Sequence, residues 1–244
     1  MYKTINTKES QMKKIYLYDD NIGSVEYVQH MGSDLTIVNA ARVSFGKQKE
    51  DIDAKDKKLI KYLIQNRHTS TLEHNIVTFR FKVPLFVRGQ HHRHRTWSYN
   101  EISRRYTSEH LEFYEPLTFR TQHKSNRQAS NDEEQINPVI TKVDFGLAPV
   151  SGVTASDMIK EHHNSSISLF NKLLNSGICR EQARGVLPQN LYTEYYGTCN
   201  LNNLVKFLDL RLDSHAQWEI RRVAEACRDI AKELWPEAMS HFSK

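Results

Sequence analysis

Hydrophobic residues follow two different periods along the chain. In VTFRFKV (77–83) every second residue is apolar, which is the spacing of a β-strand with one buried face. The segments KKIYLYD, SVEYVQH and LYTEYYGTC also have the character of short strands. We therefore predict strands at 13–19, 24–30, 77–83 and 191–199.

Other segments carry apolar residues three and four positions apart, the spacing of an amphipathic helix. Leu59, Ile60, Leu63 and Ile64 share one helical face, and a longer stripe of this kind begins at Ala216. Helices are predicted over 34–45, 51–65, 84–93, 158–174, 200–212 and 216–234. Asp34 is expected to cap the first of them.

The order of these elements indicates the fold class. Helices and strands do not alternate as regular βαβ units, so the prediction is an α+β fold in which helices pack on an antiparallel or mixed sheet. At 244 residues and 39% hydrophobic, the chain fits a single domain over 1–244. The stretch 121–157 is polar and lacks a period. We interpret it as a surface insertion, partly mobile, whose role the sequence does not indicate.

Composition narrows the class of protein. No stretch approaches the roughly 18 apolar residues of a membrane helix, and the N-terminus lacks the apolar core of a signal peptide. Cys179, Cys199 and Cys227 have no C-x-x-C spacing, which favours neither a disulfide framework nor a zinc ribbon. A cytoplasmic protein is the expectation. The net charge of +5 favours an anionic partner.

The most polar motif is RHRTWSYNEISRRY (93–106), which holds four arginines together with Asn100, Glu101 and several hydroxyl groups. Converging guanidinium groups bind phosphate oxygens bidentately, and Asn100 and Glu101 could pair with a sugar hydroxyl or a base imide. The Rossmann and P-loop motifs, G-x-G-x-x-G and G-x-x-x-x-G-K-[ST], are both absent. The segment therefore predicts a nucleotide site of another kind.

Other interpretations of this segment stay open at this point. A charge run is most often a solvated loop, and tyrosines among arginines also suit a stacking platform for nucleic acid. The three histidines of HHRH (91–94) suggest a metal site. Adjacent arginines would repel a cation, and no cysteine or carboxylate nearby has ligand spacing, so a metal is disfavoured. Ser98 or Ser103 could be a nucleophile, although neither stands in a G-x-S-x-G elbow.

Four motifs, in order, resemble those of the flavin-dependent thymidylate synthases. They are RHTSTLEH (67–74), the RHR-x7-S signature from Arg93 to Ser103, ARGVLPQNLYT (183–193) and LRLDSHAQWEIR (210–221). The resemblance implies the fold of that family and the reductive methylation of dUMP to dTMP. It also implies methylenetetrahydrofolate as carbon donor, FAD as hydride carrier and NADPH as reductant, with no cysteine nucleophile from the enzyme.

The resemblance further implies which residues contact the two ligands. The residues matching FAD contacts are His68, Ser70, Arg93, His94, Arg95, Glu101, Asn200, Asn202 and Lys206. Those matching dUMP contacts are Gln90, Arg93, Glu101, Ser103, Arg104, Arg105, Arg184 and Arg211. Two positions depart from the pattern, because Lys206 stands where relatives often carry Asn or His, and Arg104 replaces a smaller residue.

Two of these residues are expected to act in the chemistry. Arg211 is placed against the uracil ring by the resemblance, where a guanidinium would stabilise the ring anion ionised at N3 and raise electron density at C5. Ser103 is expected to position the substrate without acting as an obligatory covalent nucleophile. His215 is expected to have a structural role, as a cap of the last helix.

The assembly is also implied by the resemblance alone. The family forms homotetramers with active sites built from several subunits, and neither a membrane, a bound metal nor a stable nucleic-acid partner is expected. Two rival functions are kept. One is a nucleic-acid-binding protein that uses the basic segment. The other is a flavoprotein of different specificity on the same scaffold.

Overall fold

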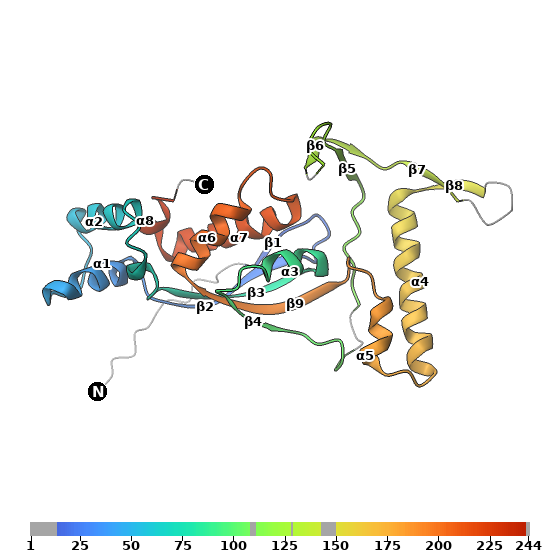
Figure 1. Cartoon of the computed structure of the whole chain (residues 1–244), viewed down its shortest axis with the longest axis horizontal. Helices are drawn as coiled ribbons and strands as arrows, with labels where there is room; N and C mark the ends of the chain where they lie inside the picture. The colour runs from blue at the N-terminus through green and yellow to red at the C-terminus, as the bar shows by residue number, and fades with distance from the viewer. Residues whose placement is uncertain (1–13, 108–110, 128, 143–149, 243–244) are drawn as a thin grey trace.

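A five-stranded antiparallel sheet forms the centre of the fold (Figure 1). The structure is a computed structural model that describes residues 14–107, 111–127, 129–142 and 150–242. The sheet order is β1 (Lys14–Tyr16), β2 (Ser24–Met31), β3 (Ile76–Pro84), β9 (Tyr192–Asn200) and β4 (Ser98–Glu101). The α+β prediction is confirmed, and every strand pair in this sheet is antiparallel.

Helices cover one face of this sheet, where α3 (Leu85–His91), α6 (Leu201–Arg211) and α7 (Trp218–Leu234) pack (Figure 1). The alternation read in 77–83 is confirmed, since its four apolar side chains are all fully buried beneath these helices. The apolar stripe of the last long helix is confirmed from Ile220 to Leu234. Ala216 lies before that helix begins. A large part of the core therefore lies between one sheet face and these three helices.

The opposite face of the sheet is polar. Arg80 pairs with Glu194 on the neighbouring strand, and the hydroxyl groups of Thr78 and Thr198 are 2.9 Å apart. In β3 and β9 these polar residues alternate with the buried apolar ones. Successive side chains therefore point to a buried face and to a polar face of the sheet in turn.

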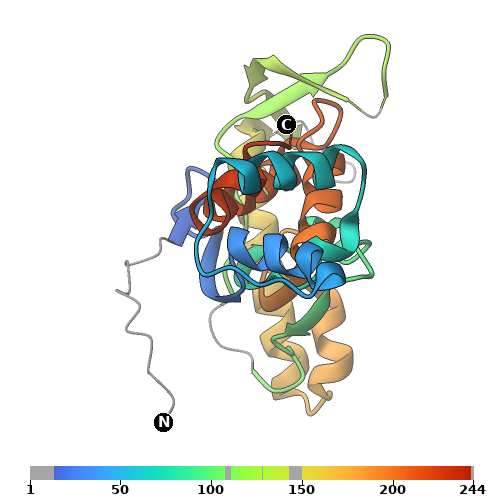
Figure 2. The ribbon, with the colours of Figure 1, turned by 90° about the vertical axis from the view of Figure 1, so that its left-hand side faces the viewer.

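The end of the molecule that faces the viewer in Figure 2 is formed by α1 (Asp34–Arg42), α2 (Ala54–Gln65) and α8 (Pro236–Met239). The prediction that Asp34 caps α1 is wrong, because Ser33 is the N-cap residue. Asp34 lies inside the first turn, and its carboxylate accepts 2.9 Å hydrogen bonds from the backbone N–H groups of Glu237 and Ala238. It therefore caps α8, which follows it by two hundred residues in the sequence.

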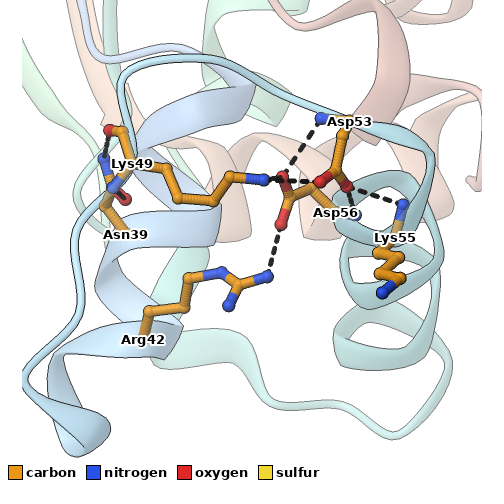
Figure 3. A network of polar contacts seen from close by, with 6 residues as sticks. All are labelled: Asn39, Arg42, Lys49, Asp53, Lys55 and Asp56. Carbon is orange, nitrogen blue, oxygen red and sulfur yellow. Dashed lines mark hydrogen bonds and ion pairs between the residues drawn. The ribbon is translucent and has the colours of Figure 1, made fainter.

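Ion pairs and hydrogen bonds connect α1 to α2 (Figure 3). The buried carboxylate of Asp56 accepts hydrogen bonds from Arg42 at 2.6 Å and from Lys49. Asp53 caps α2 by accepting from the N–H groups of Lys55 and Asp56. The pKa of Asp56 is held below its ordinary value by these hydrogen bonds, although burial of the carboxylate opposes them.

The polar stretch 121–157 has more regular structure than the sequence indicates. Two antiparallel strand pairs occur here: β5 (Phe119–Gln122), which begins just before the stretch, pairs with β6 (Ser130–Ile136), and β7 (Val139–Lys142) pairs with β8 (Val150–Thr154). α4 (Ala155–Asn175) begins three residues before the expected start, because the Thr154 side chain caps it. Neither strand pair has a long alternating pattern of apolar residues, so the sequence pattern did not predict these strands. Residues 128 and 143–149 of this stretch lie outside the described residues.

The other boundaries differ from prediction by a few residues. The helix expected over 34–45 ends at Arg42 and continues as a short 3-10 turn over Val43–Phe45. The first strand is shorter than 13–19, and residue 13 and the N-terminal segment lie outside the described residues. None of the helices in the described residues has the length and hydropathy that crossing a bilayer requires.

Candidate active site

A pocket of about 550 Å³ opens where four elements meet. Its wall is formed by the start of α3, the residues after β4, the start of β9, and the segment α5 (Arg180–Ala183) with the turn that follows. Five predicted ligand contacts lie in this region. Glu101, Ser103, Arg104 and Arg184 line the pocket, and Arg105 lies 3.9 Å from Glu181 on its rim.

Glu101 is held in one orientation inside the pocket. One of its carboxylate oxygens, Oε1, accepts a 2.6 Å hydrogen bond from the hydroxyl of Thr193 and lies 3.2 Å from Nε of Arg88. The other oxygen remains available to accept from a ligand hydroxyl or imide. Within the motif, Ser98–Glu101 forms β4 and pairs with β9. Glu101 is thus carried by an edge strand.

Two further arginines line the same pocket. The side chain of Arg184 makes no hydrogen bond or ion pair with any other described residue, and its guanidinium is exposed at the pocket. Arg104 donates a 3.3 Å hydrogen bond to the carbonyl of Tyr192, and burial lowers the pKa of Arg104. A cationic wall of this kind suits an anionic group such as a phosphate.

A second group of predicted residues forms around Arg211, the last residue of α6. Its Nε donates to Nε2 of His94 at 3.2 Å, and its Nη2 donates to the backbone carbonyl of Gln90 at 3.1 Å. A guanidinium has five N–H donors. Three therefore remain for a ligand once these two are used.

His94 is a neutral acceptor in this arrangement. Burial, and secondarily the charge of Arg211, lower its pKa to about 4. Because Nε2 accepts from Arg211, the ring proton of neutral His94 resides on Nδ1. The imidazole orients the guanidinium and adds no positive charge beside it.

We expect the His94 ring to stay neutral across the physiological range. In the unfolded chain it should titrate near its ordinary pKa of 6.5, and in the folded protein near about 4. Titration of His94 therefore leaves the free energy of unfolding unchanged above pH 6.5. As the pH falls from 6.5 towards 4, the unfolded chain binds a proton that the folded protein does not, and this free energy falls. Nitrogen-15 NMR of histidine-labelled protein measures the folded value directly. A His94 midpoint near 6.5 would contradict this assignment.

The histidines of HHRH point to different neighbours. His91 is fully buried, and its Nδ1 lies 2.8 Å from the hydroxyl of Tyr195. Burial lowers its pKa well below the ordinary value. His92 stacks on Tyr99, with ring centroids 4.1 Å apart. Among the described residues, no three His, Cys, Asp or Glu side chains converge in a metal-binding group.

A third group of predicted residues lies at the opposite end of α6 from Arg211. Asn200 caps α6 by accepting from the N–H of Asn203, and the buried Asn202 donates to Glu73 at 2.9 Å. Ser70 lies beside them on the turn Thr69–Leu72, which packs against α6. The same region holds His68, at the start of that turn, and Lys206, exposed on α6. From Asn202 to Arg211 the helix rises about 14 Å.

Arg93 and Arg95 present cationic groups that have no partner in the described part of the chain. Both side chains are exposed, and neither guanidinium bonds to another described residue. They flank His94 on the turn after α3. Basic groups without internal partners are available to an anionic ligand at no cost in lost ion pairs.

Ser103 and the cysteines can be assessed as nucleophiles. The Ser103 hydroxyl accepts from the N–H of Arg105 at 3.3 Å within a turn, and among the described residues no imidazole or carboxylate bonds to it. Cys199 and Cys227 are buried, and burial raises both pKa values well above the ordinary value. Cys227 lies in the hydrophobic core. Cys179 is exposed and its thiol lies near Gln182.

The expected capping role of His215 is wrong. α7 begins at Trp218 with Gln217 as its N-cap residue, while His215 is exposed and its ring Nδ1 lies 2.9 Å from Asp213. Sequence reasoning also missed Thr193 and Gln217, which hold Glu101 and Gln90. Both lie inside quoted motifs, but an uncharged polar residue carries no signal of its partner until the fold is known.

Comparison with known proteins shows the family. Residues 26–237 match the family model described as "Thymidylate synthase complementing protein". A flavin-dependent thymidylate synthase of Thermus thermophilus is 42% identical over 226 residues, which cover 91% of this chain and 76% of that protein. One from Thermotoga neapolitana is 40% identical over 222 residues, covering 91% of both chains. The chain belongs to the thymidylate synthase complementing protein family, that of the flavin-dependent thymidylate synthases.

Solved structures agree with this placement. The UMP/dUMP methylase PolB from Streptomyces cacaoi bound with 5-Br dUMP superimposes with a TM-score of 0.74 at 33% identity. The match covers 93% of this chain and 97% of that one. The same enzyme bound with 5-Br UMP gives a TM-score of 0.72 at 32% identity, covering 90% and 93%.

Proposed function

We propose that this protein is a flavin-dependent thymidylate synthase that converts dUMP to dTMP. Methylenetetrahydrofolate is the carbon donor, FAD the hydride carrier and NADPH the reductant. The observation that carries the proposal is the Arg211 guanidinium, which a neutral histidine orients. A separate pocket in the same chain is lined by arginines and a fixed carboxylate. The family membership and the nucleotide-bound methylases of the same fold support it.

Arg211 supplies the electrostatic part of the mechanism. Methylation at C5 of the pyrimidine requires electron density there, and ionisation at N3 provides it. A fixed guanidinium beside the imide favours that anion. His94 holds the guanidinium through Nε and, because it is neutral, does not compete with the guanidinium for the developing negative charge.

The pocket residues bind and orient the nucleotide. Arg184 and Arg105 would hold phosphate oxygens, and Arg104 narrows the pocket where the family pattern has a smaller side chain. Glu101, fixed by Thr193 and Arg88, accepts from a sugar or base donor. These contacts position C5 of the uracil ring without a covalent bond between the substrate and the enzyme.

The residues present also fit a flavin. FAD supplies the hydride when bound, and its pyrophosphate needs cationic partners. Arg93 and Arg95 are exposed and without partners among the described residues, and His94 lies between them. The group at the other end of α6, which includes Ser70 and Asn202, adds hydroxyl and amide groups. We assign these residues to flavin binding, as the family pattern implies.

We propose a homotetramer with active sites at subunit interfaces. The two groups assigned to flavin lie at opposite ends of α6 in one chain, and the Arg93 and Arg95 side chains are exposed. A second copy of the chain would complete the walls of the site. Size-exclusion chromatography with light scattering tests the assembly, and a monomer that is active at nanomolar concentration would contradict it.

Replacing Ser103 with Ala should leave measurable turnover. No general base bonds to this hydroxyl in the described residues, and the side chain closes a turn beside the pocket. Loss of one neutral hydrogen bond costs about 1 kcal/mol, so we expect a rise in the dUMP KM of up to about tenfold. Steady-state kinetics with dUMP measure this. Complete loss of activity with flavin content and dUMP affinity intact would show instead that Ser103 is an obligatory nucleophile.

The proposal is tested by tritium release from C5-labelled substrate in the presence of the folate, FAD and NADPH. We expect release from dUMP. Release from labelled UMP in preference to dUMP would favour the second specificity that the PolB description names for that enzyme. A colourless protein that fails to bind added FAD and instead binds oligonucleotides with steep salt dependence would favour the nucleic-acid rival.

A further inference from the structure

A chain of hydrogen bonds links the strand that leads into the polar insertion to the Arg211 group. It begins at Arg120 in β5, whose Nη2 lies 2.9 and 3.1 Å from the two carboxylate oxygens of Glu219. Glu219 accepts a 2.9 Å hydrogen bond from the side-chain amide of Gln217. Gln217 in turn accepts from the side-chain amide of Gln90. These residues come from β5, α7, the residue before α7, and α3.

The direction of each hydrogen bond in this chain is determined by the first acceptor. A carboxylate has no donor, so the amide that faces Glu219 must present its NH2 group. Gln217 therefore turns its carbonyl oxygen toward Gln90, and Gln90 must present its own NH2 group in return. The carbonyl oxygen of Gln90 is left on the opposite side of its amide, turned away from Gln217.

The carboxylate that sets this direction is well secured. Glu219 is only 5% exposed, and the hydroxyl of Tyr114 lies 3.4 Å from its Oε1. The guanidinium of Arg120 also lies over the Trp218 ring, 5.3 Å from the centroid. A buried carboxylate that is paired with an arginine has little freedom to turn.

The other end of the chain reaches the Arg211 group. The backbone carbonyl of Gln90 accepts from Nη2 of Arg211, while its side chain is held by Gln217. The main chain and the side chain of Gln90 are thus fixed from two different elements. With one N–H of its amide given to Gln217, the Gln90 side chain has its carbonyl oxygen directed away from Gln217, where a ligand can donate to it.

We propose that Glu219 is a positioning residue that makes Gln90 a hydrogen-bond acceptor toward the nucleotide. Gln90 would accept from an N–H or O–H group of the substrate, and Arg120 extends this control to the strand at the edge of the insertion. The inference rests on the proposed function for the identity of the ligand, which is dUMP. The orientation of Gln90 itself does not depend on it.

A double-mutant cycle tests the relay. In Glu219→Gln the residue at 219 can donate or accept, so the orientation of Gln217 and Gln90 is no longer imposed. We expect the dUMP Kd to rise about tenfold, the value of one well-made hydrogen bond at a binding site. In a Gln90→Met background, which has no amide to orient, Glu219→Gln should leave the Kd unchanged. The same tenfold rise in both backgrounds, or no rise in either, would overturn the proposal.

Matched variants separate positioning from folding. Glu225→Gln removes a carboxylate on the same helix, where it pairs with Arg222, and should leave the dUMP Kd unchanged. If Glu219→Gln does not fold, Gln217→Met interrupts the same series of hydrogen bonds at an exposed residue. Gln217→Met should raise the dUMP Kd only when Gln90 is present. An equal effect of Gln217→Met in the Gln90→Met background would count against the relay.

A ligand-free measurement distinguishes failure of the relay from failure of the proposed function. The side-chain amide signals of Gln90 in a nitrogen-15 NMR spectrum should shift in Glu219→Gln and remain in place in Glu225→Gln. If wild-type protein fails to bind dUMP while these shifts occur, the proposed substrate is wrong and the relay stands. If wild-type protein binds dUMP and the Gln90 signals do not move, the relay is wrong.

Discussion

Arg211→Lys should lose most of its dTMP-forming activity although it retains the positive charge. The guanidinium uses two donors on His94 and the Gln90 carbonyl and keeps three for the ligand. An ammonium has three donors in all and no planar fork. It cannot satisfy both protein acceptors and also hold the pyrimidine imide in the same way.

The magnitude follows from the type of contact that is lost. A charge-assisted hydrogen bond is worth about 1.5 to 3 kcal/mol, so turnover should fall by roughly ten- to a hundredfold at least. Reduction of bound flavin by NADPH in the absence of dUMP should survive, because that half-reaction does not use the uracil. Rapid-mixing measurements of the two half-reactions decide the matter. Equal loss in both, or loss in neither, would mean that Arg211 does not serve the pyrimidine.

Arg95→Ala should purify with much less flavin than the wild-type protein. The Arg95 guanidinium is exposed and has no partner among the described residues, so its removal breaks no internal ion pair and should not unfold the chain. Loss of its charge-assisted hydrogen bonds should raise the FAD Kd by about ten- to a hundredfold. Fluorescence titration of the apoprotein with FAD measures this value.

Arg127→Ala is the matched control for Arg95. Arg127 is also an exposed arginine without a partner in the described part of the chain, but it lies in the polar insertion. Its replacement should leave the FAD Kd unchanged. If both variants weaken FAD binding equally, the effect is one of net charge, and the assignment of Arg95 fails.

The parts of the fold with strong periods could be predicted from the sequence. The alternation in 77–83 specifies a strand with one buried face, and the stripe from Ile220 to Leu234 specifies a helix packed against it. The strand pairs β5–β6 and β7–β8 have no comparable pattern, because most of their side chains are exposed. Propensity alone does not distinguish such strands from loop.

The residues of the candidate site could be proposed from motifs, but their geometry could not. The family resemblance predicts ligand contacts at Arg211, His94 and Gln90, and the structure brings these three residues together. The residues that orient the Gln90 side chain, Gln217 and Glu219, lie in the quoted segment 210–221 without a distinguishing pattern. A hydrogen bond between residues more than a hundred positions apart, such as that from Gln90 to Gln217, is a consequence of tertiary packing.

Errors in capping had a similar origin. Asp34 has the residue type and the position of an N-cap, and sequence reasoning assigned it to its own helix. The structure instead uses the carboxylate to cap α8, two hundred residues later. Local preference correctly identified a capping aspartate but could not indicate which helix it caps.

The most direct test of the central claim is the product formed by the purified protein from dUMP, methylenetetrahydrofolate and NADPH after reconstitution with FAD. Chromatography coupled to mass spectrometry separates dTMP from dUMP. The account predicts dTMP, formed only when all four components are present and strongly reduced in Arg211→Lys. A flavin-loaded protein that oxidises NADPH and binds dUMP but forms no dTMP would contradict it.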